Sequence, residues 1–244
     1  MADNHQEPVP PDRLLVISAH PDDIEFVLAG TVAKWVRAGT QARYVVVTSG
    51  DAGTHRMDVD RETLGRIREA EQTAAARVVG VDTVIYLRYL DGMVEPTLEL
   101  RRELVREIRR FKPHTVICYD PTRLFSGTGY INHPDHRAVG LAALDAISPT
   151  AAMPLAFPEQ IAEGLEPHRV RQIMTAATPQ PDTWIDISET LDLKLEALKQ
   201  HVSQHDGRRD LNALIRSWAE AAGAEAGLQY AEAFRRITRP EGLD

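Results

Sequence analysis

The sequence predicts an α/β fold: a single Rossmann-like domain of three layers, in which a mostly parallel sheet carries helices on both faces. Short apolar segments rich in Val, Ile and Tyr alternate along the chain with longer segments in which apolar residues recur every three or four positions. The 244 residues, of which 43% are hydrophobic, are enough to bury one large core. Strands and helices that alternate in this way form a parallel sheet covered on both sides.

Four strands are predicted in the first half of the chain. Each is a nearly continuous apolar run, as in strands that are buried on both faces, and they cover 13–18, 42–49, 82–87 and 114–119. Three segments with helical spacing lie between them, at 25–39, 61–80 and 98–111. The first two end at Gly39 and Gly80, and the third stops before Pro113, because glycine and proline commonly end helices.

The second half of the chain continues this pattern less regularly. The expected elements are a helix at 134–147, strands at 171–177 and 183–188, a helix at 188–204 and a final helical region at about 208–222. A proline-rich connection at 149–167 is interpreted as a surface insertion. Since there is no internal repeat and no clear boundary, we expect one domain over 13–244 after a polar, flexible arm at 1–12.

Charge and composition exclude several classes of function. The net charge of -8 argues against binding to nucleic acid or to an anionic membrane, because both need clustered Lys and Arg. The basic cluster at 101–110 alternates with Glu and aliphatic residues and is interpreted as a solvated helix face. No apolar run is long enough for a membrane span, and we expect no secretory signal. The single cysteine, Cys118, is expected to be a buried, reduced thiol, which fits a cytoplasmic protein.

Acidic and histidine-rich segments follow the predicted strands. The segment HPDD at 20–23 follows the first strand, Asp51 the second, Asp91 the third, and GTGYINHPDH at 127–136 the fourth. The carboxyl ends of parallel strands share one edge of the sheet, where α/β proteins bind their ligands. These side chains are therefore expected to gather at one ligand-binding edge.

The segment HPDH at 133–136 repeats the first three residues of HPDD at 20–23. In both, a proline places the preceding histidine at a strand-to-helix transition, so that the residue three positions on lies one turn later. His20, Asp23 and His136 would then form a site of two imidazoles and one carboxylate, which suits a catalytic metal and leaves a position for water. Asp22 cannot easily bind the same ion as its neighbour and is the candidate general base.

These two motifs resemble those of the LmbE-like or PIG-L family of zinc-dependent N-acetylglucosaminyl de-N-acetylases. The resemblance spans roughly residues 13–205 and rests on AHPDDIE, HPDH, VVVTSGDAG, RIREAEQTAAARVVGV, YLDG and KLEALKQHVSQ. It implies a zinc-dependent amidohydrolase with one Zn²⁺ per chain. The expected reaction removes an N-acetyl or related N-acyl group from a small amino-sugar molecule.

The resemblance also implies a role for each residue of the site. The resemblance assigns the metal-ligand role to His20, Asp23 and His136 and the general-base role to Asp22. It assigns substrate contacts to Arg68, Asp91 and His201. His133 is expected to face the developing oxyanion and Asp135 to orient His133. A neighbouring carboxylate stabilises the protonated imidazole, so we expect Asp135 to raise the pKa of His133.

One residue departs from the family pattern, and several alternatives stay open. A relative in the mycothiol pathway has a tyrosine two residues before HPDH, where this chain has Ile131 and where Tyr130 is one position away. The substrate is alternatively a thiol or antibiotic conjugate. A non-haem Fe(II) enzyme would use the same kind of triad, and Fe²⁺ is the alternative metal. A dinucleotide-binding site is not supported, because no G-x-G-x-x-G segment follows the first predicted strand of this chain. The sequence leaves open whether the chain forms a homo-oligomer.

Overall fold

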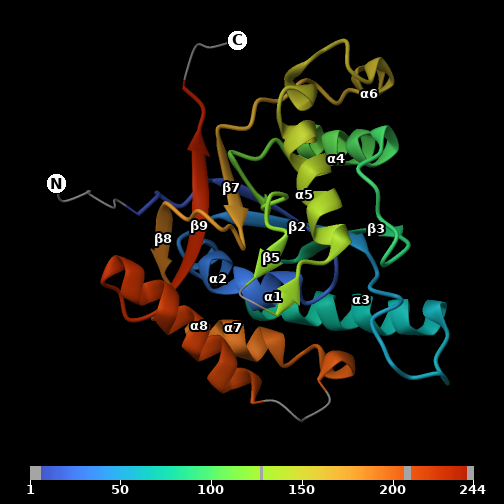
Figure 1. Ribbon diagram of the computed structural model, residues 1–244. Helices are drawn as coiled ribbons and strands as arrows, with labels where there is room; N and C mark the ends of the chain where they lie inside the picture. Colours follow the sequence, from blue (N-terminus) through green and yellow to red (C-terminus); the bar gives the residue numbers. More distant parts are fainter. Residues whose placement is uncertain (1–6, 127–128, 206–209, 241–244) are drawn as a thin grey trace.

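The computed structural model describes residues 7–126, 129–205 and 210–240. These residues form one main sheet with helices packed on both of its faces (Figure 1). The strands lie in the order β3 (Thr83–Tyr89), β2 (Gln41–Thr48), β1 (Arg13–Ser18), β4 (Thr115–Tyr119), β7 (Gln172–Ala176), β9 (Ala231–Thr238) and β8 (Thr183–Asp186). A separate hairpin pairs β5 (Phe125–Ser126) with β6 (Tyr130–Ile131).

Most neighbouring strands of the main sheet run parallel, as predicted. The pairs β3–β2, β2–β1, β1–β4 and β4–β7 are parallel, whereas β9 runs antiparallel to both β7 and β8. The chain builds outward from β1 to β2 and β3 and then returns to the other side of β1 with β4. This reversal makes a crevice at the carboxyl ends of β1 and β4, which is where such sheets bind ligands.

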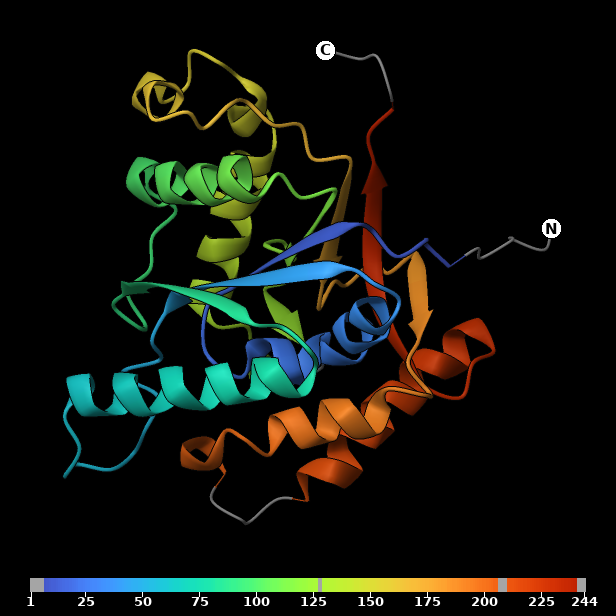
Figure 2. The same cartoon turned by 180° about the vertical axis from the view of Figure 1, so that it is seen from behind.

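Helices cover the two faces of the sheet as separate layers (Figures 1 and 2). One layer contains α4 (Leu98–Phe111) and α5 (Pro134–Ile147), and the other contains α1 (Asp23–Val27), α2 (Ala29–Arg37), α3 (Arg61–Val78) and α7 (Leu191–Leu198), with α8 (Leu211–Ala226) outside α7. Alternate residues of β1 enter opposite cores: Leu15 and Ile17 join the first, and Leu14 and Val16 the second. Burial on both faces is why this strand is apolar throughout.

The helix predicted at 25–39 is divided in two, because the backbone of Leu28 leaves the helical conformation with φ -145°. This break creates a new helix start at α2, whose first amide groups need acceptors. Glu232 on β9 supplies them, since its two carboxylate oxygens accept hydrogen bonds from the amides of Gly30 (3.1 Å) and Thr31 (2.7 Å). Lys194 balances the buried charge of Glu232 at 2.5 Å.

Strand β9 was not predicted from the sequence. Its residues AEAFRRIT include three charged side chains, so they lack the apolar run typical of the other buried strands. The strand is nevertheless paired on both sides and buries Phe234 completely. Its partners, and not its own composition, define it as a strand.

The helix predicted at 188–204 ends at Leu198 and is followed by a short 3-10 turn, η2 (Val202–Gln204). The last helix begins at Leu211 and ends at Ala226, later than predicted. Residues 206–209, where that prediction began, lie outside the described residues.

The connection at 149–167 contains two short helices, η1 (Thr150–Ala152) and α6 (Pro158–Ala162). Arg109 of α4, which is 1% exposed, fixes this segment to the domain. Its guanidinium donates hydrogen bonds to the carbonyl groups of Thr150, Ala151, Met153, Ala156 and Phe157 and to Oε1 of Gln160. The insertion is therefore organised around one buried cation without a carboxylate partner among these contacts.

The predicted arm is described only from Glu7 onward. Glu7 forms an ion pair with Lys34 of α2 at 2.5 Å, and Pro8 is buried. Cys118 is a buried free thiol in β4. None of the helices in the described ranges combines the length and the apolar character that crossing a bilayer requires.

Candidate active site

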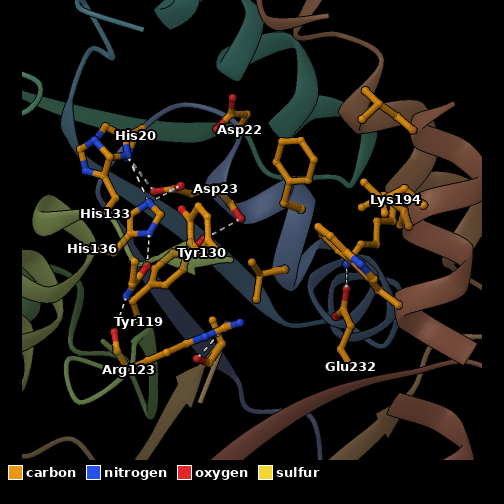
Figure 3. Close-up of a pocket in the computed structure, with 18 of the residues that line it drawn as sticks. His20, Asp22, Asp23, Tyr119, Arg123, Tyr130, His133, His136, Lys194 and Glu232 are labelled. Atoms are coloured by element: carbon orange, nitrogen blue, oxygen red, sulfur yellow. Dashed lines mark hydrogen bonds and ion pairs between the residues drawn. The ribbon is translucent and has the colours of Figure 1, made fainter. Parts of the chain in front are cut away.

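A cavity of about 1220 Å³ opens at the carboxyl edge of the sheet, and its lining includes both His-Pro-Asp segments (Figure 3). His20, His133 and His136 gather at one end of the close-up, and Lys194 and Glu232 lie at the other. This cavity is larger than the usual range of about 300–1,000 Å³ for small-molecule sites. The site therefore has room beyond its histidine-rich end.

The first segment turns sharply between β1 and α1. Asp22 takes a left-handed backbone conformation, with φ 87°, and Asp23 begins the helix. The carboxylate of Asp23 then faces back toward the strand, where its Oδ2 accepts from the amides of Ala19 (3.1 Å) and His20 (2.8 Å). These bonds hold Asp23 beside the His20 side chain.

The second segment opens α5 in the way that its proline predicts. His133 is the N-cap residue, its Nδ1 accepts from the amide of Asp135 (3.3 Å), and Pro134 occupies the first turn. His136 lies one turn on, and its Nδ1 is 3.0 Å from Oδ1 of Asn132. Because Nδ2 of Asn132 donates to the carbonyl of Arg123, Oδ1 must accept from His136. In the neutral ring, which is the form that binds a metal, the lone pair of His136 is therefore on Nε2.

The structure brings the three predicted ligands together. Nε2 of His136 lies 2.9 Å from Oδ1 of Asp23 and 3.3 Å from Nδ1 of His20, which in turn is 3.5 Å from Oδ2 of Asp23. Burial alone would raise the pKa of Asp23, but the charges of His136 and His20 outweigh it and hold that pKa well below its ordinary value. Asp23 is therefore ionised, as a metal ligand must be.

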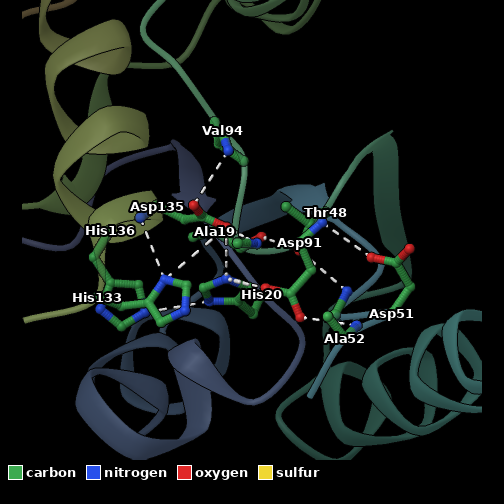
Figure 4. A network of polar contacts seen from close by, with 12 residues as sticks. Ala19, His20, Thr48, Asp51, Ala52, Asp91, Val94, His133, Asp135 and His136 are labelled. Atoms are coloured by element: carbon green, nitrogen blue, oxygen red, sulfur yellow. Dashed lines mark hydrogen bonds and ion pairs between the residues drawn. The ribbon is translucent and has the colours of Figure 1, made fainter. Parts of the chain in front are cut away.

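The other nitrogen of His20 faces two carboxylates (Figure 4). Its Nε2 lies 3.1 Å from Oδ1 of Asp91 and 3.2 Å from Oδ2 of Asp135. A histidine that binds a metal generally donates its second N–H to a carboxylate, which leaves the first nitrogen free for the ion. Asp91 and Asp135 thus direct Nδ1 of His20 toward Asp23 and His136.

This arrangement revises the expectations for both aspartates. Asp135 is fully buried and accepts from the amides of Gly92 (2.7 Å) and Val94 (3.2 Å), while its Oδ2 is 4.0 Å from Nδ1 of His133. Its shorter side-chain contact is with His20, so it orients that residue more directly than His133. Asp91 lines the cavity but is only 6% exposed and faces His20, so its main contact is with protein and not with open space for substrate.

Among the residues that the structure describes, two overlapping groups of ligand atoms are close enough to hold a metal ion: His20, Asp23 and His136, and His20, Asp91, His133 and Asp135. The second group is the poorer fit, because backbone amides already occupy both oxygens of Asp135 and one oxygen of Asp91. In the first group, the free nitrogens of two imidazoles and Oδ1 of Asp23 converge. This donor set fits a divalent metal such as zinc, with room for a further ligand.

Asp22 lies beside this group and retains contact with the cavity, with 16% of its side chain exposed. Burial raises its pKa to about 6, against the lowering effect of the Arg68 guanidinium. Arg68 was expected to contact substrate. It lines the cavity with only 4% of its surface exposed, and its Nη atoms donate to the carbonyls of Pro21 (2.7 Å) and Gly50 (2.8 Å) and to Oδ2 of Asp22 (3.2 Å). Its main contacts are therefore with the loops that carry the site.

His133 lies next to His20, with the two rings edge to face at 4.6 Å and 37% of the His133 side chain exposed. The pKa of His133 is lowered, first by burial and then by the charge of His20. The charge of Asp135 raises this pKa, as expected, but it is outweighed, so the net shift is opposite to the expected one. Since Nδ1 accepts the capping hydrogen bond, the proton of the neutral ring is on Nε2.

His201 was expected to contact substrate, but it is not part of the cavity lining. It is fully buried, and its Nε2 lies 3.1 Å from Oε2 of Glu25. Burial pulls the pKa of His201 down, but its hydrogen bond and charge attraction to Glu25 outweigh this effect and raise the pKa. Tyr130 lines the cavity, whereas its neighbour Ile131 is 69% exposed.

Sequence reasoning missed several side chains that complete the site. Tyr119, at the end of β4, stacks on the ring of His136 at 4.4 Å and donates its hydroxyl to the carbonyl of Asp23 (3.2 Å). Phe26, one turn after Asp22, begins an apolar part of the cavity that α8 completes with Leu214 and Trp218. The only available signal was position: Tyr119 ends a predicted strand at the ligand-binding edge.

Comparisons with known proteins agree with this geometry. A model of the GlcNAc-PI de-N-acetylase (PIG-L) family matches residues 15–147. Diacetylchitobiose deacetylase of Thermococcus kodakarensis is 32% identical over 227 residues, covering 92% of this chain and 83% of that protein. A probable N-acetyl-alpha-D-glucosaminyl L-malate deacetylase 2 of Bacillus anthracis is 29% identical over 199 residues, covering 79% of this chain and 81% of that protein.

A solved deacetylase structure also resembles this chain. N,N'-diacetylchitobiose deacetylase from Pyrococcus horikoshii, determined with an inhibitor, superposes with a TM-score of 0.87 at 29% identity. The match covers 93% of this chain and 84% of that one. The matched residues include most of β1 and both His-Pro-Asp segments, which are the parts of the chain that build the candidate metal-binding group. The chain therefore belongs to the GlcNAc-PI de-N-acetylase (PIG-L) family.

Proposed function

We propose that the protein is a zinc-dependent hydrolase that removes an N-acetyl group from an amino sugar. The observation that carries this proposal is the convergence of His20, Asp23 and His136 at one end of a large cavity, with Asp22 beside them. The relatives named above support the substrate class, since their names describe deacetylases of diacetylchitobiose and of a glucosaminyl malate.

Nδ1 of His20, Nε2 of His136 and Oδ1 of Asp23 are the atoms that would hold the metal. A bound zinc ion polarises the amide carbonyl and lowers the pKa of water from about 15.7 toward 7. Tyr119 and Asn132 keep the ring of His136 in place from its face and from its Nδ1 edge. Asp91 and Asp135 hold the ring of His20 through their contacts with its Nε2.

Asp22 acts as the general base in this proposal. Arg68 donates to its Oδ2, and we assign the proton transfer to Oδ1. With a pKa raised to about 6, the carboxylate is ionised at neutral pH and still basic enough to take a proton from water. The same oxygen then returns the proton to the departing amine, which cannot leave as an anion.

His133 stabilises the negative charge that develops on the carbonyl oxygen. Its Nδ1 is occupied by the Asp135 amide, so Nε2–H is the donor available to the substrate. A lowered pKa keeps this imidazole neutral at neutral pH. The donor is held in place before the reaction because His133 caps α5, and such fixed donors are among the largest contributions to catalysis.

The cavity favours a substrate that is larger than a single acetamido sugar. Polar side chains surround the histidine-rich end, and the part lined by Phe26, Leu214 and Trp218 is apolar. An amino sugar that carries a further sugar or an apolar substituent would use both parts. An antibiotic or thiol conjugate with an amide is the second candidate, and the apolar part of the cavity favours it. A reducing compartment such as the cytoplasm fits the buried free thiol of Cys118.

The test is release of a primary amine from a panel of substrates by the zinc-loaded protein. The panel contains N-acetylglucosamine, diacetylchitobiose, alkyl glycosides of N-acetylglucosamine and acetylated conjugates of thiols and antibiotics. We expect turnover of at least one amino sugar, its loss on zinc chelation and its return with added zinc. Asp23→Ala serves as the inactive control. Absence of amine release from every amino sugar, with metal bound, would contradict the proposed function.

A further inference from the structure

A chain of three buried polar side chains ends at the backbone of Asp22. Gln72 of α3, Glu25 of α1 and His201 after α7 are each 0% exposed. The amide of Asp22 donates to Oε1 of Gln72 (2.9 Å), and Nε2 of Gln72 donates to Oε1 of Glu25 (3.0 Å). Oε2 of Glu25 completes the chain at 3.1 Å from Nε2 of His201. Three separate elements thus meet behind one residue of the candidate site.

The chemistry of each group fixes the direction of every bond in this chain. A backbone N–H only donates, so Gln72 must turn its oxygen toward Asp22 and its NH₂ group toward Glu25. The carboxylate of Glu25 accepts from Gln72 on one oxygen and from His201 on the other. The side-chain amide of Gln72 is therefore held at both ends in a single orientation.

Asp22 needs such support because of its backbone. Its φ of 87° and ψ of -25° are unusual for a residue with a side chain, and conformations of this kind persist only where the surroundings enforce them. Arg68 holds the carbonyl of Pro21 and the carboxylate of Asp22, but it does not contact the Asp22 amide. The hydrogen bond to Gln72 fixes that amide, and with it the direction in which the side chain leaves the backbone.

We propose that Gln72 is a positioning residue that holds the left-handed backbone of Asp22 and so directs the Asp22 carboxylate toward the reacting water. Glu25 and His201 assist by fixing the Gln72 amide. This inference rests on the proposed role of Asp22 as general base. Gln72 acts through Asp22, since it is fully buried and is not part of the cavity lining.

A double-mutant cycle tests this dependence. Gln72→Met keeps the side-chain length and removes both hydrogen bonds, and we expect it to lower kcat about 10- to 100-fold with KM and bound zinc unchanged, as for a displaced catalytic group. In the Asp22→Asn background the same change should have no further effect on kcat, because the base that it positions is already absent. Equal losses in both backgrounds would overturn the proposal.

The matched control is Gln160→Met. Gln160 is also 0% exposed and joins two elements, since it donates to the carbonyl of Arg102 and accepts from Arg109, but it lies outside the cavity. Both variants should lose stability, and only Gln72→Met should lose kcat. An equal loss of kcat in Gln160→Met would show that buried glutamines act here through stability alone and would overturn the inference.

A second measurement does not depend on activity. Hydrogen exchange of the Asp22 amide, followed by NMR, should accelerate at least about tenfold in Gln72→Met and stay unchanged in Gln160→Met, because only the first loses the acceptor of that amide. Unchanged exchange in Gln72→Met would overturn the inference even if the enzyme is active. If the wild-type protein releases no amine, the proposed function fails, and the exchange experiment still decides whether Gln72 holds Asp22.

The conservative variant Gln72→Glu provides a rescue and covers the case in which Gln72→Met does not fold. Beside the buried carboxylate of Glu25, the new carboxyl group keeps its proton, because two neighbouring carboxylates cannot both be charged. It then presents an acceptor to Asp22 and a donor to Glu25, as glutamine does. We expect protected Asp22 exchange and a kcat within about threefold of wild type, since the contacts that position the base are retained. Fast exchange in this variant would contradict the proposed contact.

Discussion

The two His-Pro-Asp segments begin with the same three residues and use two of them differently. In the first, His20 is 7% exposed and turns Nδ1 toward Asp23 and His136. In the second, His133 caps α5 through its own Nδ1 and leaves 37% of its side chain exposed. The first histidine belongs to the candidate metal-binding group, and the second lines the cavity beside it.

The aspartates at the third position differ even more. Asp22 has a left-handed backbone and lies at the cavity, whereas Asp135 lies in the first turn of α5 and is fully buried against the amides of Gly92 and Val94. The fourth residues, Asp23 and His136, converge in spite of these differences. Because the two motifs share this aspartate, backbone conformation at the third position, and not the motif itself, decides which aspartate faces the cavity.

The largest effect is expected at the fourth position, where the two segments agree. Asp23→Ala and His136→Ala should each remove most of the bound zinc and abolish turnover, because each deletes one of three protein ligands. The folded domain should persist, since the ligands lie at the edge of the sheet. Elemental analysis and circular dichroism of the purified variants are the measurements. Stoichiometric zinc in both variants would show that the ion binds elsewhere.

The next effect separates the two aspartates at the third position. Asp22→Asn should keep its zinc and lose about 10²- to 10⁴-fold in kcat, the range for a positioned general base. The pKa of Asp22 is raised to about 6, so the basic form is present above that pH and wild-type turnover should fall as the pH drops through it. A pH series with zinc measured at each point is the check. An unchanged acid limb in Asp22→Asn would assign that limb to another group.

The third comparison concerns the histidines at the first position of each segment. His133→Ala should keep its zinc and lose about 10²- to 10³-fold in kcat, as the removal of an oxyanion donor does. His20→Ala should instead lose the metal. Because the pKa of His133 lies below its ordinary value, its neutral form is the donor, and wild-type turnover should not fall as the pH rises through neutrality. Zinc loss in His133→Ala would make this residue a ligand and erase the contrast with His20.

The smallest effect is expected for Asp135→Asn. The change keeps an oxygen for only one of the amides of Gly92 and Val94, which donate to different oxygens, and removes the charge that faces Nε2 of His20. Zinc affinity should weaken about 10- to 100-fold, the usual cost of losing a carboxylate behind a ligand histidine. Competition with a chelator measures it, and kcat at saturating zinc should change little. A large loss of kcat with normal zinc affinity would place Asp135 behind His133 after all.

Residues whose positions depend on the nearby chain were predictable. His20, Asp23 and His136 converge because a proline and a strand end fix each segment, and both signals are visible in the sequence. Strands β1 and β2 were predictable for a similar reason, since burial on both faces leaves continuous apolar runs. The parallel order of the sheet then brought the two segments to one edge.

Residues whose orientation depends on distant partners were not predictable. Arg68 lines the cavity, but its guanidinium is turned toward the carbonyls of Pro21 and Gly50. His201 is buried against Glu25 and is not part of the cavity lining. The helix start that follows the break at Leu28 is capped by Glu232, which lies about 200 positions later. In these cases the local sequence is compatible with several orientations, and a partner from another element selects one.

The place of β9 between β7 and β8 has a consequence for the order of assembly. Strand β8 is made before β9 but pairs with β9 and not with β7, so during synthesis β8 has no sheet edge to join until the later strand has emerged. The same strand delivers Glu232 to the start of α2, close in the chain to the turn that carries Asp22. A ribosome-bound chain that lacks β9 therefore already contains the three proposed metal ligands but not the carboxylate that caps α2.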